Sequence, residues 1–462
     1  MVSLFKQDKI RTFEYIYFFV MVIYMAQIDS YTSRMVGTLS PPWFPFFFPI
    51  VLTIILLDRN KVKFDDKRLI RILLTFAIWT ALLFSHKQHY DSVQYSYVFF
   101  LFYSIIIAYI HIQVFGKKML PLYEHIMVRL CIIALFLWSI AVIYPGSATF
   151  FRGFPQTSLG RNVYYLFVWL DEAESGGAMV TYNGILRNAG CTWEPGRFSI
   201  MILLALYCNM ARCGIKFRGN WSSIILLISL ITTQSTTGYI GALVLYSIFA
   251  FKKFDVKYIL AFLIIIVPIG YQLSKMEFMQ EKIAEQLDMD TNLRKLDESM
   301  DYVNKVKKSN EYVGSLSRFS SIYFEIINIE HDPILGYGRN AGKSYFAQRI
   351  SGNYNLTSGL LKMFGQHGIP LGIILYIILY RSSAALGRDF HVRKFALFVI
   401  YLIFLTSYSI FTVPIFTAFW FYGIFRKQED LILITSDGNS KENDKDKTSE
   451  IVATSNESVL HS

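Results

Sequence analysis

Long apolar runs are the feature that most limits what this chain can fold into. Residues 126–144, 258–271 and 358–380 are near-continuous apolar stretches, at or close to the length that a helix needs to cross a bilayer. Hydrophobic residues make up 53% of the 462 residues. A soluble chain of this composition would have to bury helices that are apolar all round. The sequence therefore predicts an all-α protein that crosses a membrane many times.

Hydropathy predicts about twelve membrane spans, with a range of about ten to twelve because several are short for a full crossing. The predicted spans are residues 12–28, 43–57, 69–84, 93–114, 124–144, 197–213, 220–234, 237–251, 257–273, 357–380, 394–411 and 413–425. We expect residues 1–425 to form a single integral membrane domain. Residues 426–462 are polar and should form a largely disordered cytoplasmic tail.

Lysine and arginine alternate between the predicted connections, and this alternation predicts the orientation. The connection after the second span is rich in cations, whereas the short connections on the other side carry few. The pattern places both termini in the cytoplasm of a multi-pass inner-membrane protein. It also explains the net charge of +11, so that nucleic acid is not an expected partner.

Two predicted connections are long, and both face outward. They cover residues 145–196 and 274–356, and the later one includes a charged helical stretch at 276–308. The predicted spans themselves carry little charge, whereas these loops carry a great deal. We therefore expect the chemistry of this protein to lie at the outer membrane surface.

The first long connection ends in a short charged motif that runs straight into a span. Arg187 is followed by Glu194 and Pro195, and Arg197 comes two residues later. Pro195 suits the first turn of a helix, which places Glu194 at the N-cap, near the positive end of the helix dipole. Two interpretations remain open here: a helix cap with an interfacial anchor, or part of an active site.

The second long connection ends in a predicted amphipathic helix that begins at Arg318. His331-Asp332-Pro333 should stop this helix, and Gly336 and Gly338 should make a flexible turn that presents Arg339. The apolar positions that recur at helical spacing are Phe319, Ile322, Ile326 and Ile329. Arginine suits a diphosphate because its planar fork donates two parallel hydrogen bonds. The alternative is that these arginines pair with nearby acids such as Glu325 or Glu330.

Four segments together resemble the O-antigen polymerase and O-antigen ligase-like superfamily of bacterial surface-polysaccharide enzymes. They are Arg187 with Glu194-Pro195-Gly196, then Gln234-Ser235-Thr236-Thr237-Gly238, then Arg318 with Asp332-Pro333-Ile334-Leu335-Gly336-Tyr337-Gly338, and finally the Gly365–Pro370 segment. Each motif is short, but their order and their placement over residues 187–371 resemble this family. The hydropathy layout, with a large outer loop late in the chain, is also similar.

The resemblance implies a metal-independent glycosyltransferase that needs no cofactor. It would transfer a saccharide from undecaprenyl diphosphate at the outer face of the cytoplasmic membrane, and direct attack would invert the anomeric carbon. Arg187 and Arg318 would bind the donor diphosphate, while Glu194 would orient Arg187 or activate the acceptor hydroxyl. Further expected contacts to the diphosphate or sugars are Arg197, Arg339, His331 and Tyr337. A chain-length regulator and a flippase are the expected protein partners.

One departure from the family decides between two activities. Ligases of this superfamily usually carry a histidine where the late outer loop enters its span, and this sequence has Thr357-Ser358 there. We therefore predict a polymerase that joins lipid-linked repeat units into O-antigen, capsule or exopolysaccharide. A ligase that transfers a glycan to lipid A-core remains the first alternative. A flippase or another transporter is the second, although it should carry charge or broken helices at the membrane midplane.

Overall fold

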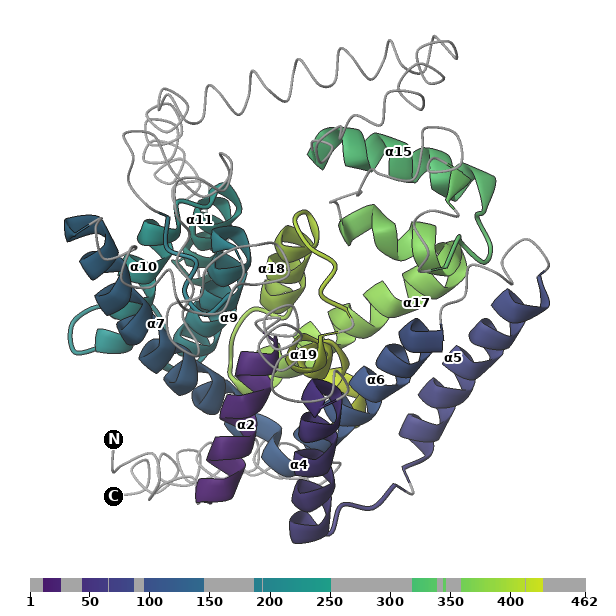
Figure 1. The fold of residues 1–462 in the computed structure, drawn as a ribbon, viewed down its shortest axis with the longest axis horizontal. Helices are drawn as coiled ribbons and strands as arrows, with labels where there is room; N and C mark the ends of the chain where they lie inside the picture. The colour runs from purple at the N-terminus through teal and green to yellow at the C-terminus, as the bar shows by residue number, and fades with distance from the viewer. Residues whose placement is uncertain are drawn as a thin grey trace, which may run out of the picture.

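The protein is helical wherever its structure can be followed (Figure 1). The computed structural model describes residues 11–25, 44–64, 66–86, 95–144, 187–192, 194–250, 318–338, 344–345, 359–411 and 413–426. No strand occurs within these ranges. The predicted all-α class is thereby confirmed for the part of the chain that is described.

Each predicted span that falls within these ranges coincides with a helix. The helices are α2 (Thr12–Met25), α4 (Phe44–Asn60), α5 (Lys67–Ser85), α6 (Tyr95–Phe115), α7 (Met119–Ile143), α9 (Pro195–Cys213), α10 (Trp221–Thr233), α11 (Thr236–Ala250), α15 (Arg318–His331), α17 (Gly359–Asp389), α18 (Ala396–Leu405) and α19 (Pro414–Phe425), with a short 3-10 turn η2 (Gly116–Lys118) between α6 and α7. The largest departures are α17, which is longer than predicted, and α18, which is shorter. The predicted span 257–273 and helical stretch 276–308 lie outside the described residues, as does the tail beyond residue 426.

Helix α9 lies at the centre of one half of the molecule. Its residues from Pro195 to Ala211 are all buried, and α7, α10, α11 and α18 pack around it (Figure 1). A helix that is apolar all round is expected to be buried on every side. Helix α9 also carries the motif residues Gly196 and Arg197 at its start, so this packing fixes one part of the candidate site.

The second half is built around α17 and α19. Helix α19 packs against α17 and α6, and the indole Nε1 of Trp420 donates to the carbonyl of Leu375 at 2.9 Å. At the far end of α17, Asp389 accepts from Arg426 at 2.7 Å and from the Tyr422 hydroxyl at 2.9 Å. Both charged side chains of this ion pair are almost completely buried. These contacts fix the end of α17 that lies away from the motif segments.

A second ion pair, between a buried carboxylate and a partly exposed arginine, joins α7 to α9. The Glu124 carboxylate is buried and accepts from Arg212 Nη2 at 2.8 Å and from Asn209 Nδ2 at 2.7 Å. Asn209 in turn exchanges hydrogen bonds with Asn220, the N-cap of α10. With these donors, both oxygens of the buried carboxylate have hydrogen-bond partners. The arrangement ties α7, α9 and α10 together.

Apolar side chains on the outside of the helices identify a membrane protein. On α5, Ile70, Leu74, Ile78 and Leu82 recur every four residues and are each about half exposed. Three helical stretches are long and apolar enough to cross a membrane: Lys67–Ser85, Leu101–Ile143 (the last part of α6, η2 and α7) and Gly359–Asp389. Other helices are apolar but shorter, such as Trp221–Thr233 and Pro414–Phe425.

Candidate functional site

Arg187 holds the end of helix α10. Its Nε donates to the carbonyl of Thr233 and its Nη2 to the carbonyl of Gln234, both at 3.1 Å. The last carbonyls of a helix have no partner within the helix, so a cation placed there satisfies them and meets the negative end of the dipole. Gln234 takes a left-handed conformation that ends α10. Arg187 therefore has a structural contact as well as its expected role at a diphosphate.

The residues after Arg187 form a tight buried turn against the same helix end. The Asn188 amide N–H donates to Thr232 O and its Nδ2 to Thr232 Oγ1, both at 2.9 Å. Gly190 has a φ of +56°, and a Cβ there would collide with the ring of Phe198. Only glycine meets both demands. The Arg187–Thr192 segment is thereby held firmly against α9 and α10.

The start of α9 carries the predicted carboxylate and second arginine. Glu194 is the N-cap and Pro195 the first helical residue, as the sequence predicted, although the Glu194 side chain does not cap the helix. A Cβ added to Gly196 would lie 2.6 Å from the Tyr408 hydroxyl and 3.4 Å from Glu194 Oε1. Glycine at position 196 thus lets the tyrosine and the carboxylate approach the same point of the backbone.

Arg197 is buried rather than exposed at an interface. Only 4% of the residue is exposed, and its guanidinium carbon lies 6.0 Å from the centre of the Tyr408 ring. The interpretation of Arg197 as an interfacial anchor is therefore wrong. Sequence reasoning missed this because Tyr408 lies far along the chain, in the segment between α18 and α19.

Small hydroxyl residues line the junction between α9, the α10–α11 turn and the end of α18. Ser199 Oγ donates to Ser235 Oγ at 3.0 Å, and the hydroxyls of Thr237 and Ser407 lie 2.8 Å apart. A Cβ on Gly238 would lie 2.8 Å from Ser199 Cβ. The first two motif segments, around Glu194 and around Gln234, therefore contact each other directly.

The third and fourth motif segments meet at a break in helix α17. Gly368 has a φ of +76° and a ψ of +162°, and Pro370 follows without an N–H to donate. The backbone groups that the break releases all find partners. Tyr337 N donates to Gly365 O at 2.8 Å, Gly338 N to Gln366 O at 3.2 Å, and Ile369 N to Pro333 O at 2.7 Å. The carbonyl of His367 accepts from Trp79 Nε1 at 3.0 Å.

This pairing corrects the predicted flexible turn. Gly336 and Gly338 do have positive φ, but a Cβ on Gly336 would collide with the carbonyl of Gly365. The glycines therefore allow the 333–338 segment to lie closely against α17, and the segment is held by backbone hydrogen bonds. Helix α15 itself begins at Arg318 and ends at His331, which confirms the predicted helix and its stop.

The buried face of α15 is not the apolar face that the sequence predicted. Ser321, Phe324, Glu325 and Asn328 are buried, whereas Ile326 is 43% exposed. Helix α15 packs on α17, and Figure 1 shows it lying over the first part of that helix. The contact involves polar side chains and glycine backbone, which an analysis of apolar periodicity does not detect.

Glu325 is a buried carboxyl that the sequence analysis considered only as a partner for arginine. The Tyr337 hydroxyl donates to its Oε1 at 2.9 Å, and Asn328 Nδ2 donates to its Oε2 at 3.4 Å. Burial raises the pKa of Glu325 to about 7, against the opposing effects of the Tyr337 hydrogen bond and the charge of Lys362. Its Oε2 lies against Gly365, where a Cβ would not fit. Tyr337, predicted as a substrate contact, is buried as its partner.

The remaining predicted site residues are placed in part. His331 is exposed at the end of α15, with its ring centre 4.3 Å from that of Tyr345. Arg318 is the first residue of α15, while its side chain and the whole of Arg339 lie outside what the structure describes. Helix α15 and the α9–α11 group lie apart in Figure 1, on either side of α18. No described contact joins Arg187 to α15.

One short segment connects the first pair of motifs to the start of α17. The 407–409 segment after α18 contacts Thr237 and Gly196 on one side, as described above. On its other side the Tyr408 carbonyl lies against Gly359, the first residue of α17, where a Cβ would collide with it. The junction beside α9 thus holds two arginines and the carboxylate at the N-cap of α9, whereas the buried carboxyl of Glu325 lies at the separate α15–α17 contact. Among the described residues, no group of three or more His, Cys, Asp or Glu is placed to hold a metal ion.

Comparison with models of known protein families, with curated proteins and with solved structures finds no match to this chain.

Proposed function

We propose that this protein is a membrane glycosyltransferase that polymerises saccharide repeat units carried on undecaprenyl diphosphate. The observation that carries the proposal is the pairing of the four motif segments. Arg187 and Ser199, three residues after Gly196, contact the Gln234–Gly238 turn, and the Asp332–Gly338 segment contacts the Gly365–Pro370 segment. Each pair of motif segments is thus brought together in space, and residues 407–409 link the first pair to the start of α17.

The proposed reaction needs a base, an acceptor hydroxyl and a stabilised leaving group. The acceptor hydroxyl oxygen forms a bond to the anomeric carbon, while the bond from that carbon to the diphosphate oxygen breaks and its electron pair leaves with the diphosphate. The hydroxyl proton passes to the Glu194 carboxylate. Arg187 and Arg318, with Arg339, offset the charge that develops on the departing diphosphate. This attack inverts the anomeric configuration.

Arg187 is the residue on which the proposal can be tested most directly. We expect Arg187→Ala to abolish long polymer, and Arg187→Lys to reduce it strongly because an ammonium cannot donate two parallel hydrogen bonds. Arg218→Ala is the matched control, since Arg218 is an exposed arginine on the α9–α10 connection. Chain length would be read on gels from cells that carry each variant. Thermal unfolding of the purified variants shows whether polymer is lost because the protein is destabilised at the end of α10 or because catalysis fails.

Deletion of the gene separates the three candidate functions. Loss of a polymerase leaves single repeat units on the lipid carrier and on the surface glycan. Loss of a ligase leaves long polymer on the carrier, and loss of a flippase leaves single units that an outside enzyme cannot reach. Mass spectrometry of the lipid-linked fraction separates the ligase from the other two, and single repeat units on the surface glycan separate the polymerase from the flippase. Long lipid-linked polymer in the deletion strain would overturn the polymerase assignment.

A further inference from the structure

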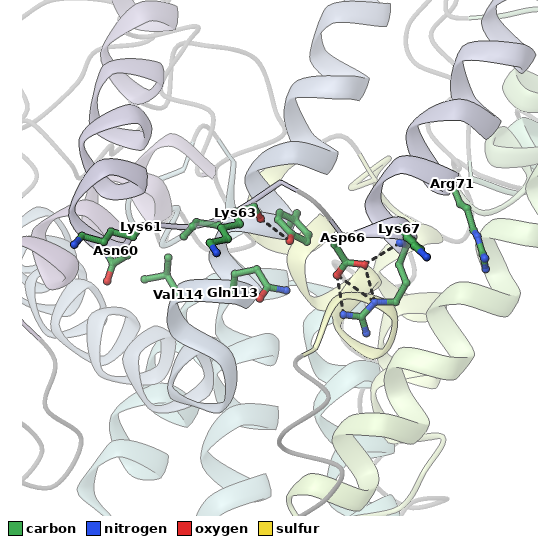
Figure 2. Close-up of a pocket in the computed structure, with 11 residues that line it drawn as sticks. Asn60, Lys61, Lys63, Asp66, Lys67, Arg71, Gln113 and Val114 are labelled. Atoms are coloured by element: carbon green, nitrogen blue, oxygen red, sulfur yellow. Dashed lines mark hydrogen bonds and ion pairs between the residues drawn. The ribbon is translucent and has the colours of Figure 1, made fainter.

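A basic cavity lies at the opposite end of α17 from the motif segments. It has a volume of about 700 Å³ and is bounded by the end of α4, the start of α5 and the end of α6 (Figure 2). Its lining residues are Asn60, Lys61, Val62, Lys63, Asp66, Lys67, Arg68, Arg71, Tyr109, Gln113 and Val114. Arg68 joins it to the end of α17, because its Nη1 donates to the carbonyl of Arg426, the partner of Asp389.

The cavity holds more positive charge than its own acid can offset. Among the described lining residues Asp66 is the single acid, and Arg68 binds it with Nη2 at 2.7 Å and Nε at 2.9 Å. These hydrogen bonds also lower the pKa of Asp66. The other cations in the lining are Lys61, Lys63, Lys67 and Arg71. Their side chains make no hydrogen bond or ion pair with any residue that the structure describes.

The wall of the cavity is fixed in place. The Tyr109 hydroxyl donates to the carbonyl of Lys63 at 3.0 Å, and Gln113 Nε2 donates to the carbonyl of Phe425. Asp66 caps α5 by accepting from the Arg68 backbone N–H at 2.8 Å. Figure 2 shows Lys61 and Lys63 on the α4–α5 connection, with Gln113 and Val114 on α6 and Lys67 and Arg71 on α5. The backbone that carries these cations is therefore held in place by hydrogen bonds.

Lys61 adopts a backbone conformation that a lysine rarely takes. Its φ is +48°, in the left-handed region that favours glycine, and the neighbouring N–H groups of Lys61 and Val62 donate back to Asp58 and Leu57. A glycine would serve this helix end with less strain. Strained backbone positions are often found at functional sites. Here a lysine occupies such a position, and its side chain lines the cavity.

An apolar stripe begins where the cations end. Ile70 lies directly before Arg71, and Leu74, Ile78 and Leu82 continue along the same exposed face of α5. The acyl chains of a lipid can make apolar contacts along this stripe, whereas an inorganic phosphate ion cannot. Basic pockets between membrane helices on the cytoplasmic side are known to hold phosphate headgroups.

We propose that this cavity binds the phosphate headgroup of an anionic phospholipid whose acyl chains lie along the exposed face of α5. Lys61, Lys63, Lys67 and Arg71 bind the phosphate oxygens. The site is independent of the glycosyl transfer proposed above, because none of its residues belongs to the motif segments.

Two charge-matched variants test this proposal. Lys63→Gln with Lys67→Gln removes two cavity cations and leaves three others, Lys61, Arg68 and Arg71, in the lining. Lys216→Gln with Arg218→Gln removes two exposed cations from the α9–α10 connection. Native mass spectrometry would follow phosphatidylglycerol, cardiolipin and phosphatidylcholine on the purified protein. We expect the first variant to lose anionic lipid affinity by about tenfold or more, and the second to keep it.

A third variant separates binding from folding. Lys61→Gly removes a cavity cation and relieves the positive φ, so we expect equal or higher thermal stability with several-fold weaker binding of phosphatidylglycerol. Equal binding by the Lys63/Lys67 and Lys216/Arg218 variants would overturn the proposal. So would inorganic phosphate at millimolar concentration displacing phosphatidylglycerol completely, because the site would then take a free anion rather than a lipid.

Discussion

Glu325 shows how much one buried side chain can change the interpretation of a segment. The sequence suggests it only as an ion-pair partner for the nearby arginines. In the structure it is covered by Tyr337 and by the backbone at Gly365, and its pKa is raised to about 7. The groups that bury it come from later in the chain, so no local pattern could reveal them.

The raised pKa makes stability depend on pH. Between pH about 4.5 and about 7, the folded protein holds a proton on Glu325 that the unfolded chain has released. The free energy of unfolding therefore falls as the pH rises through this window, and it stays lower above pH 7. Glu325→Gln keeps the acceptor for Tyr337 without a charge. We expect this variant to be more stable at pH 8, by an amount on the order of a few kcal/mol.

Thermal unfolding in lipid nanodiscs between pH 5 and pH 8 would measure this effect. Glu330→Gln, an exposed position on the same helix, is the control and should follow the wild type. A Glu325→Gln variant with the same pH dependence as the wild type would contradict the assignment.

The Glu124–Arg212 pair gives a second prediction at the residue scale. Glu124→Ala would leave Arg212 and Asn209 without the carboxylate that joins α7 to α9. We expect a loss of about 1–3 kcal/mol in stability, because the buried Asn209 amide loses its acceptor while the partly exposed Arg212 can turn to solvent. Glu124→Gln should lose less, because an amide oxygen can still accept from Asn209. Denaturation of the purified variants in detergent would rank them, and equal stability of Glu124→Ala and wild type would count against the role.

At the scale of elements, the positions of helices could be predicted and their contacts could not. Hydropathy located the helices that are described, usually within a few residues, because a bilayer requires long apolar runs. The burial of Arg197 and the packing of α15 were missed. Both depend on partners distant in sequence, Tyr408 for the first and Gly365 for the second. Motif order suggested that such segments belong together, but it gave no geometry.

The break in α17 allows a controlled test of the α15–α17 contact. Gly368 and Gly219 both have positive φ, +76° and +78°, so alanine strains the backbone at both. At Gly368 the added Cβ would also collide with the Ile334 carbonyl, whereas at Gly219 it meets open space. We expect Gly368→Ala to release α15 and to raise hydrogen exchange over residues 321–338. Gly219→Ala should leave that exchange unchanged, and the same exchange pattern in both variants would contradict the contact.

At the scale of the whole molecule, the exposed apolar face of α5 predicts where lipid lies. A nitroxide attached to a cysteine at Ile78, which is 61% exposed, should be relaxed by oxygen more than by a water-soluble nickel complex. A label at Phe217, exposed on the α9–α10 connection, should show the reverse. Electron paramagnetic resonance in proteoliposomes would measure both. Stronger relaxation by nickel at position 78 would place α5 outside the bilayer.

Helix α17 connects the motif segments at one end with the basic cavity at the other. Its first turn touches the Tyr408 carbonyl, its break receives the 333–338 segment, and its last residue holds Arg426. The break divides it into a short arm and a long anchored shaft. The 333–338 segment is hydrogen-bonded to α17 at this break, so a displacement of α15 would act on the short arm, whereas the ion pair between Asp389 and Arg426 would hold the shaft in place.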